Sequence, residues 1–110
     1  MASISLLQRA KELETRIRGI LSSFDIDGLS HSQRNLVATI MRQAADVKLD
    51  IRDYEYAETR DEQLAQVHQG KRRFAALQKN IIRASEYDMF SAMDIAQISA
   101  HIEHITSNME

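Results

Sequence analysis

The sequence contains no cysteine, no proline and no tryptophan, and only three of its 110 residues are glycine. Without cysteine, the protein has no disulfide, no thiolate-bound zinc or iron–sulfur cluster, and no cysteine nucleophile. The scarcity of proline and glycine disfavours a β-rich fold and a glycine-rich phosphate loop, because both need turn-forming residues. No apolar run approaches the roughly 18 residues of a membrane span. We therefore expect no role in a membrane, and we take the cytoplasm as the default location.

The composition is that of an ordinary globular domain. Charged residues make up 27% of the chain and hydrophobic residues 44%, which argues against both a disordered chain and a membrane protein. A chain of 110 residues is long enough to bury a core without disulfides. We therefore expect residues 1–110 to form one domain.

The first predicted helix precedes an acidic turn at residues 25–28. Ser3 is its expected N-cap, and the acidic residues and glycine of the turn should end it. Apolar residues in steps of three and four are typical of a helix that buries one face. Those residues are Leu6, Ala10, Leu13, Ile17, Ile20 and Phe24.

A second apolar stripe follows Ser30 and Gln33, whose spacing predicts a capping box at the start of a helix. Its residues are Val37, Ile40, Ala44, Val47, Ile51 and Tyr54.

The stripe weakens over residues 55–63, and two interpretations are open there. A new helix can begin at a second capping box, formed by Thr59 and Glu62. Alternatively, one long helix can run to Gln69 and end at Gly70 as its C′ glycine. No strong helix breaker occurs between residues 31 and 69, so the pattern leaves the choice open.

The start of the last helix is the clearest local signal. After a stripe that runs through Phe74, Leu77, Ile81 and Ala84, Ser91 and Asp94 fit a capping box. A hydrophobic staple from Phe90 to Ile95 supports a helix start near residue 92. The apolar seam that follows is Ile95, Ile98, Ile102, Ile105 and Met109.

Together these segments predict an all-α fold, an antiparallel helix bundle with four helices, or three if one is long. Short loops place consecutive helices antiparallel to each other. The repeated three-four spacing favours coiled-coil-like packing.

Charge is strongly segregated along the chain although the formal net charge is only −2. Residues 63–84 carry five basic side chains and no acidic one, whereas residues 85–110 carry five acidic side chains and no basic one. The basic segment could contact nucleic-acid phosphates. The favoured interpretation is that it pairs with acidic helices, within the chain or across a dimer. The five basic residues are Lys71, Arg72, Arg73, Lys79 and Arg83.

Histidines offer a third class of function. His101 and His104 are one helical turn apart, as two metal ligands could be, but neither has the glutamate three positions earlier that di-iron bundles use. The stretch from His68 to Arg72 resembles, over five residues, the phosphorylated-histidine region of histidine phosphotransfer domains. In that family a glycine follows the lysine, whereas here Gly70 precedes it. A phosphorelay or metal-binding bundle therefore ranks third.

No catalytic motif such as Gly-x-Ser-x-Gly or His-Glu-x-x-His is present, so we expect no enzyme, no cofactor and no metal. The sequence favours a small interaction or adaptor protein that self-associates, as a dimer, and presents a helix face to a protein partner. A nucleic-acid-binding accessory protein is the alternative. The expected interface is the seam of Ile95, Ile98, Ile102 and Ile105.

Overall fold

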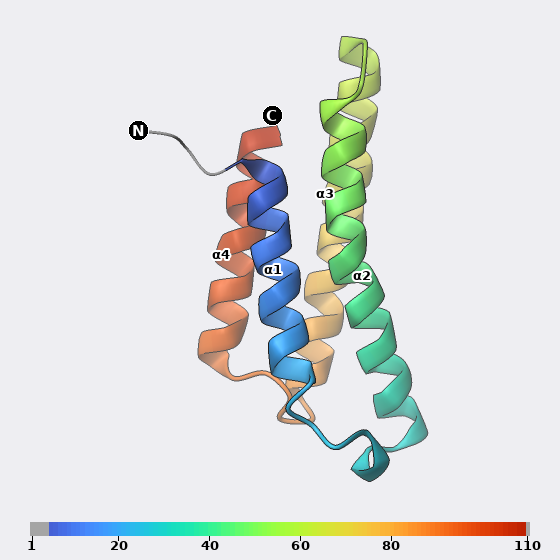
Figure 1. Ribbon diagram of the computed structural model, residues 1–110, viewed down its shortest axis with the longest axis vertical. Helices are drawn as coiled ribbons and strands as arrows, with labels where there is room; N and C mark the ends of the chain where they lie inside the picture. Colours follow the sequence, from blue (N-terminus) through green and yellow to red (C-terminus); the bar gives the residue numbers. More distant parts are fainter. Residues whose placement is uncertain (1–4, 110) are drawn as a thin grey trace.

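The computed structural model describes residues 5–109, which contain four α-helices and one turn of 3-10 helix (Figure 1). The predicted all-α helix bundle is confirmed, in its four-helix form. The helices are α1 (Leu6–Leu21), α2 (His31–Glu55), α3 (Arg60–Ser85) and α4 (Ala92–Met109), and the 3-10 turn η1 is Ile26–Gly28.

Helix α1 begins at an N-cap serine. The backbone N–H of Gln8 donates to the Ser5 hydroxyl at 3.1 Å, which satisfies one of the unpaired donors of the first turn. Ser3, the cap expected from the sequence, lies outside the described residues.

Two capping boxes form as predicted, and they fix the starts of α2 and α4. Gln33 N donates to Ser30 Oγ at 3.2 Å, and Ser30 N donates back to Gln33 Oε1 at 2.8 Å. Asp94 N donates to Ser91 Oγ at 3.0 Å, and Ser91 N donates to Asp94 Oδ2 at 3.1 Å. In both boxes the two side chains satisfy donors that the helix itself leaves unpaired.

The break between α2 and α3 decides between the two sequence interpretations. Thr59 caps α3, because its hydroxyl accepts from Glu62 N at 3.1 Å, while the Glu62 carboxylate accepts from Glu58 N at 3.0 Å. A single helix running from 31 to 69 is therefore wrong.

Gly70 ends no helix and lies buried within α3, where an added Cβ would be 3.4 Å from Met109 Cε. That distance is an ordinary van der Waals contact, so Gly70 lies directly beneath the end of α4.

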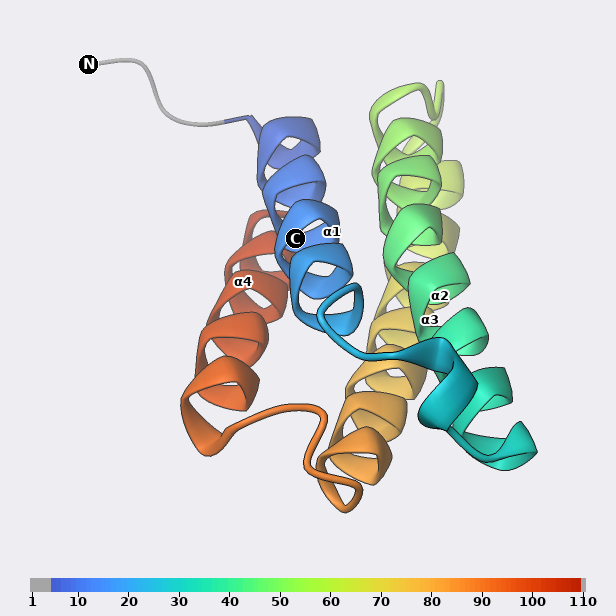
Figure 2. The same cartoon turned by 60° about the horizontal axis from the view of Figure 1, so that its bottom comes forward.

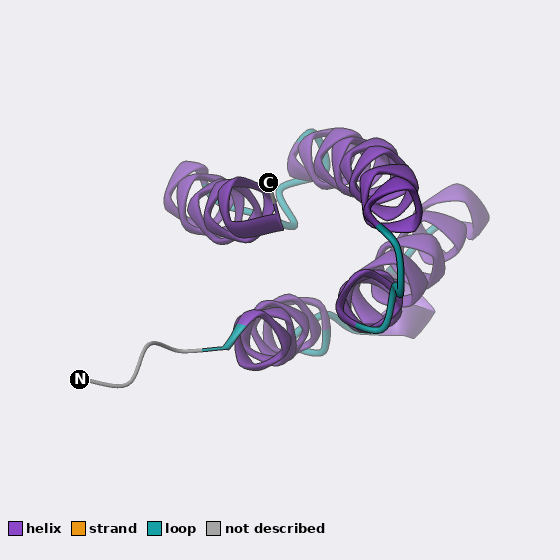
Figure 3. Ribbon diagram, turned by 90° about the horizontal axis from the view of Figure 1, so that it is seen from above, coloured by secondary structure: helices purple, strands orange, loops and turns teal. Residues whose placement is uncertain are grey.

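The helices run alternately up and down, and each packs against its chain neighbours while α1 also packs against α4 (Figure 3). Helices α2 and α3 have 25 and 26 residues, against 16 and 18 in α1 and α4. At 1.5 Å per residue they are longer by about 10–15 Å. Their shared end therefore projects beyond the other two helices as an arm (Figures 1 and 2).

The predicted stripes meet in one buried cluster to which all four helices contribute. Only two charged side chains within residues 5–109 are buried with it, Glu14 and Asp50. The Glu14 carboxylate of α1 forms two ion pairs. Its Oε1 atom lies 2.7 Å from Lys48 Nζ of α2, and its Oε2 atom lies 3.3 Å from Arg18 Nε. The largest fully buried apolar side chains are Leu13, Ile17, Leu21, Ile40, Ile51, Leu77, Ile81, Ile98, Ile105 and Met109.

Candidate functional site

The five basic residues of 63–84 point in three different directions around α3. Arg73 faces α2 and donates to Asp50 Oδ1 at 2.8 Å. Lys71 faces α4 and lines a groove there together with Glu103. The other three basic residues lie apart from these two, on the outward side of the helix.

Arg72, Lys79 and Arg83 are exposed and occupy one face of α3. Spacings of seven and four residues bring side chains to the same side of a helix. None of the three has an ion pair within residues 5–109. The expected pairing of the basic segment with acidic side chains therefore occurs at Arg73, whereas Arg72, Lys79 and Arg83 face solvent.

The Asp50–Arg73 pair joins α2 to α3 inside the bundle. The Asp50 side chain is 1% exposed, and its second oxygen, Oδ2, has no hydrogen-bond partner within residues 5–109. Burial raises the pKa of Asp50 above its usual value, and the Arg73 guanidinium partly opposes that rise. Neighbouring Asp46 and Asp53 add to the rise in pKa. Asp50 is closed off from solvent, so within this pair only Arg73 is accessible to a ligand.

The isoleucine seam predicted as an interface packs mainly into the core of the chain itself. Ile98, Ile102 and Ile105 are 1–4% exposed, and only Ile95 is partly accessible. A partner can reach this seam only where a groove opens between α4 and its neighbours. The assignment of these four residues to an interface stays a prediction.

Such an opening runs between α3 and α4, and we call it the α3/α4 groove. One part has a volume of about 210 Å³ and the other about 390 Å³, and Gln78 lines both. Ile82 is one of its lining residues and is 53% exposed. The apolar lining residues are Phe74, Ala75, Ile81, Ile82, Ile95, Ile98 and Ile102, and the polar ones include Lys71, Ser99, Glu103 and Thr106.

The three histidines singled out in the sequence do not form one cluster. His68 is exposed on α3, and His104 is exposed on α4. His101 is partly buried against α1, and burial together with the nearby Arg9 lowers its pKa. Within residues 5–109 no group of three His, Cys, Asp or Glu side chains lies close enough to hold a metal ion.

Sequence reasoning missed the role of α1 in the surface around His101. Arg9 and Arg16, together with His101 and His104, line a groove between α1 and α4. Their spacing of seven residues places the two arginines on one helix face, which the sequence does show. The missing information was that α1 and α4, far apart in the chain, are neighbours.

A comparison with known protein families, curated proteins and solved structures finds no match to this chain. Within residues 5–109, no helix is both long enough and apolar enough to cross a bilayer.

Proposed function

We propose that the protein is a small non-enzymatic interaction module that binds an amphipathic helix of a partner protein along the α3/α4 groove. The observation that carries this proposal is an apolar groove whose lining includes the exposed side chain of Ile82. Small side chains such as Ala75 and Ser99 line it, so another helix could approach closely. An amphipathic helix laid into an apolar groove is a common mode of recognition between proteins.

The charge beside the groove favours an acidic partner helix. Arg72 lies three residues before Ala75 and Lys79 three residues before Ile82, so both cations are surface neighbours of groove-lining residues. Arg83 lies farther round α3, where it lines a pocket with α2. None of the three has an ion pair within residues 5–109. A helix about 10 Å wide lying in the groove would bring its flank close to Arg72 and Lys79. Complementary charge mainly increases the rate of association and excludes wrong partners.

The test uses two designed helical peptides with the same leucine seam, one flanked by glutamates and one by lysines. Their binding is followed by fluorescence anisotropy. The glutamate peptide should bind, and Ile82→Glu should weaken it by about tenfold or more, because that change puts a charge into the apolar contact. Leu49→Glu is the matched control, since Leu49 is 47% exposed on α2, outside the groove. Equal binding of both peptides, or equal effects of the two variants, would refute the proposal.

Self-association, which the sequence predicts, is tested with the same two variants by light scattering. If a second copy occupies the groove, Ile82→Glu should lower the mass of the assembly and Leu49→Glu should leave it unchanged. A dimer that survives Ile82→Glu would place the self-association surface elsewhere.

Nucleic-acid binding is the second candidate function, and the outward row of three unpaired cations favours it. Each phosphate contact contributes about 0.9 to the slope of log affinity against log salt concentration, so three contacts give a slope near −2.7. Replacing Arg72, Lys79 and Arg83 with glutamine should abolish that salt dependence on a random DNA duplex. Replacing Arg34, Arg42 and Arg52, which are exposed on α2, is the charge-matched control. A duplex affinity that neither triple variant changes would exclude this surface.

A further inference from the structure

The groove between α1 and α4 lies on a different side of α4 from the α3/α4 groove. It has a volume of about 400 Å³ and is lined by Arg9, Arg16, Gln97, Ala100, His101 and His104. No acidic side chain lines it, although the chain as a whole carries more acid than base.

Three nitrogen atoms in this groove are buried and unpaired. Nε of Arg9, Nε of Arg16 and Nδ1 of His101 have no hydrogen-bond partner within residues 5–109. A guanidinium Nε–H is always a donor, so both arginines present a buried N–H that lacks an acceptor. Leaving a buried donor unsatisfied is costly, and more so when the group is charged. All three atoms belong to residues that line the groove, so the groove gathers basic side chains whose donors are not all used within residues 5–109.

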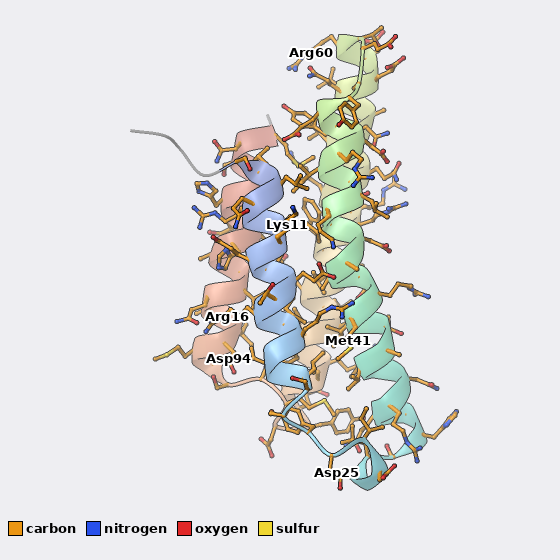
Figure 4. All side chains as sticks on the ribbon, viewed as in Figure 1. Lys11, Arg16, Asp25, Met41, Arg60 and Asp94 are labelled. Carbon is orange, nitrogen blue, oxygen red and sulfur yellow. The ribbon has the colours of Figure 1, made fainter. Side chains whose placement is uncertain are left out.

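The two helices hold these side chains toward a common space. Arg9 and Arg16 are two turns apart on one face of α1, and His101 faces them from α4, close enough for both cations to affect its titration. The Arg16 Nη2 atom also lies 3.7 Å from Asp94 Oδ1, and Figure 4 shows these two residues side by side. That contact engages only the Nη2 end of the Arg16 guanidinium.

We infer that the α1/α4 groove binds a small oxyanion of the phosphate class, either inorganic phosphate or the phosphoryl group of a phosphomonoester. Such an anion offers several acceptor oxygens in a compact tetrahedron. Guanidinium groups bind phosphate oxygens through charge-assisted hydrogen bonds, which are stronger than neutral ones. The ligand would accept from the guanidinium groups of both arginines and, once His101 is protonated, from its imidazolium.

All charged groups around His101 enter the pH dependence of binding. Arg9 and Arg16 on α1 lower the pKa of His101, Glu12 on α1 raises it, and His104 on α4 lowers it. An anion bound beside His101 favours its cationic form. Binding should therefore strengthen as the pH falls from about 7.5 to 5.5.

Sulfate is the probe for this pH dependence, because its charge is constant over that range whereas phosphate itself titrates. Affinity is measured by calorimetry and by NMR titration of the backbone amides and histidine rings. Melting temperatures are not used, since sulfate and phosphate stabilise most folded proteins without binding a site. His101→Gln should remove the pH dependence and His104→Gln should leave most of it.

The binding test compares two variants of equal charge. Arg9→Gln with Arg16→Gln should weaken sulfate and phosphate binding by about tenfold or more, because two charge-assisted donors are lost. Arg72→Gln with Arg83→Gln, on the outward face of α3, should leave it unchanged. Equal weakening in both variants, or a titration that does not saturate, would overturn the site. If the double variant fails to fold, Arg16→Gln alone is compared with Arg72→Gln. Weaker binding in Arg16→Gln only supports the site, and equal weakening in both variants overturns it.

Phosphoserine distinguishes the two sources of the ligand. Tighter binding of phosphoserine than of inorganic phosphate points to a phosphorylated molecule, and the reverse order points to the free ion. Absence of saturable binding for all three probes refutes the inference. None of these outcomes depends on the α3/α4 groove, so the proposed helix-binding function is tested separately.

Discussion

Arg73 of α3 donates a 2.8 Å hydrogen bond to Asp50 of α2, and this bond compensates one of only two buried charged side chains within residues 5–109. The arginine itself is about half exposed, while the aspartate is closed off. The pair therefore joins the solvent-facing guanidinium of Arg73 to the carboxylate of Asp50, whose charged form burial disfavours. Its role is to align the two longest helices.

Removing the cation should destabilise the bundle. We expect Arg73→Ala to lower the free energy of unfolding by about 2 kcal/mol, less than the roughly 3–5 kcal/mol for a fully buried pair, because solvent screens the exposed guanidinium. Urea unfolding measures this change. Arg72→Ala, one residue away but facing outward, should stay within about 0.5 kcal/mol. Equal losses in the two variants would show that the Asp50 contact does not stabilise the fold.

Stability should also depend on the ionisation of Asp50. Burial raises its folded-state pKa above its unfolded value, so the folded protein binds the proton more readily. Between the two pKa values stability due to this group therefore increases as the pH falls and decreases as it rises. The wild-type protein should gain stability relative to Asp50→Asn when the pH is lowered from 7 toward 4. Unfolding curves of both proteins at several pH values measure this, and a constant difference would contradict the shifted pKa.

Two helical glycines should respond differently to a side chain larger than alanine. A Cβ at Gly19 meets nothing within 4 Å, so Gly19→Ala should stabilise the protein by about 1 kcal/mol through helix propensity alone. A Cβ at Gly70 would lie 3.4 Å from Met109 Cε and 3.5 Å from the Phe74 ring. These are ordinary van der Waals distances, so Gly70→Ala should gain a similar amount, whereas the larger side chain of Gly70→Val should clash with these neighbours and be destabilising. Thermal unfolding of the three variants tests the close approach of α3 and α4, which would be wrong if Gly70→Val matched Gly19→Ala.

The capping box of α4 should contribute measurably to stability. Ser91→Ala removes the hydroxyl that accepts from Asp94 N and should cost about 1 kcal/mol. Ser107→Ala is the control, because Ser107 is exposed near the other end of α4. Chemical unfolding of the two variants compares them. A loss at Ser107 as large as that at Ser91 would mean that the cap adds nothing.

The features that local chemistry controls were predictable from the sequence. The Ser30–Gln33 and Ser91–Asp94 boxes depend on side chains three residues apart, and the sequence displays that spacing directly. Gly70 misled the interpretation, because the same residue can end a helix or admit a neighbour, and its contact with Met109 appears only after folding. The coiled-coil-like packing inferred from the three-four spacing stays a prediction.

The candidate sites depend on which helices become neighbours, and this explains why the sequence located them poorly. The basic segment looked uniform along the chain, yet helix geometry turns Arg73 inward and leaves Arg72 outward. The arginines of α1 gained their significance only from His101, which is more than 80 residues away in the sequence. Pairing across such a distance leaves no local pattern.

The unequal helix lengths have a consequence for motion. In the arm, the end of α2 and the start of α3 lie past the ends of the other two helices (Figures 1 and 2). Segments with few buried apolar contacts open at lower free energy than a core does. Amide hydrogens of the arm, from its tip to about Gly70 in α3, should therefore exchange faster with solvent than those of the four-helix body. The arm would then unfold locally from its tip while the four-helix body stays folded.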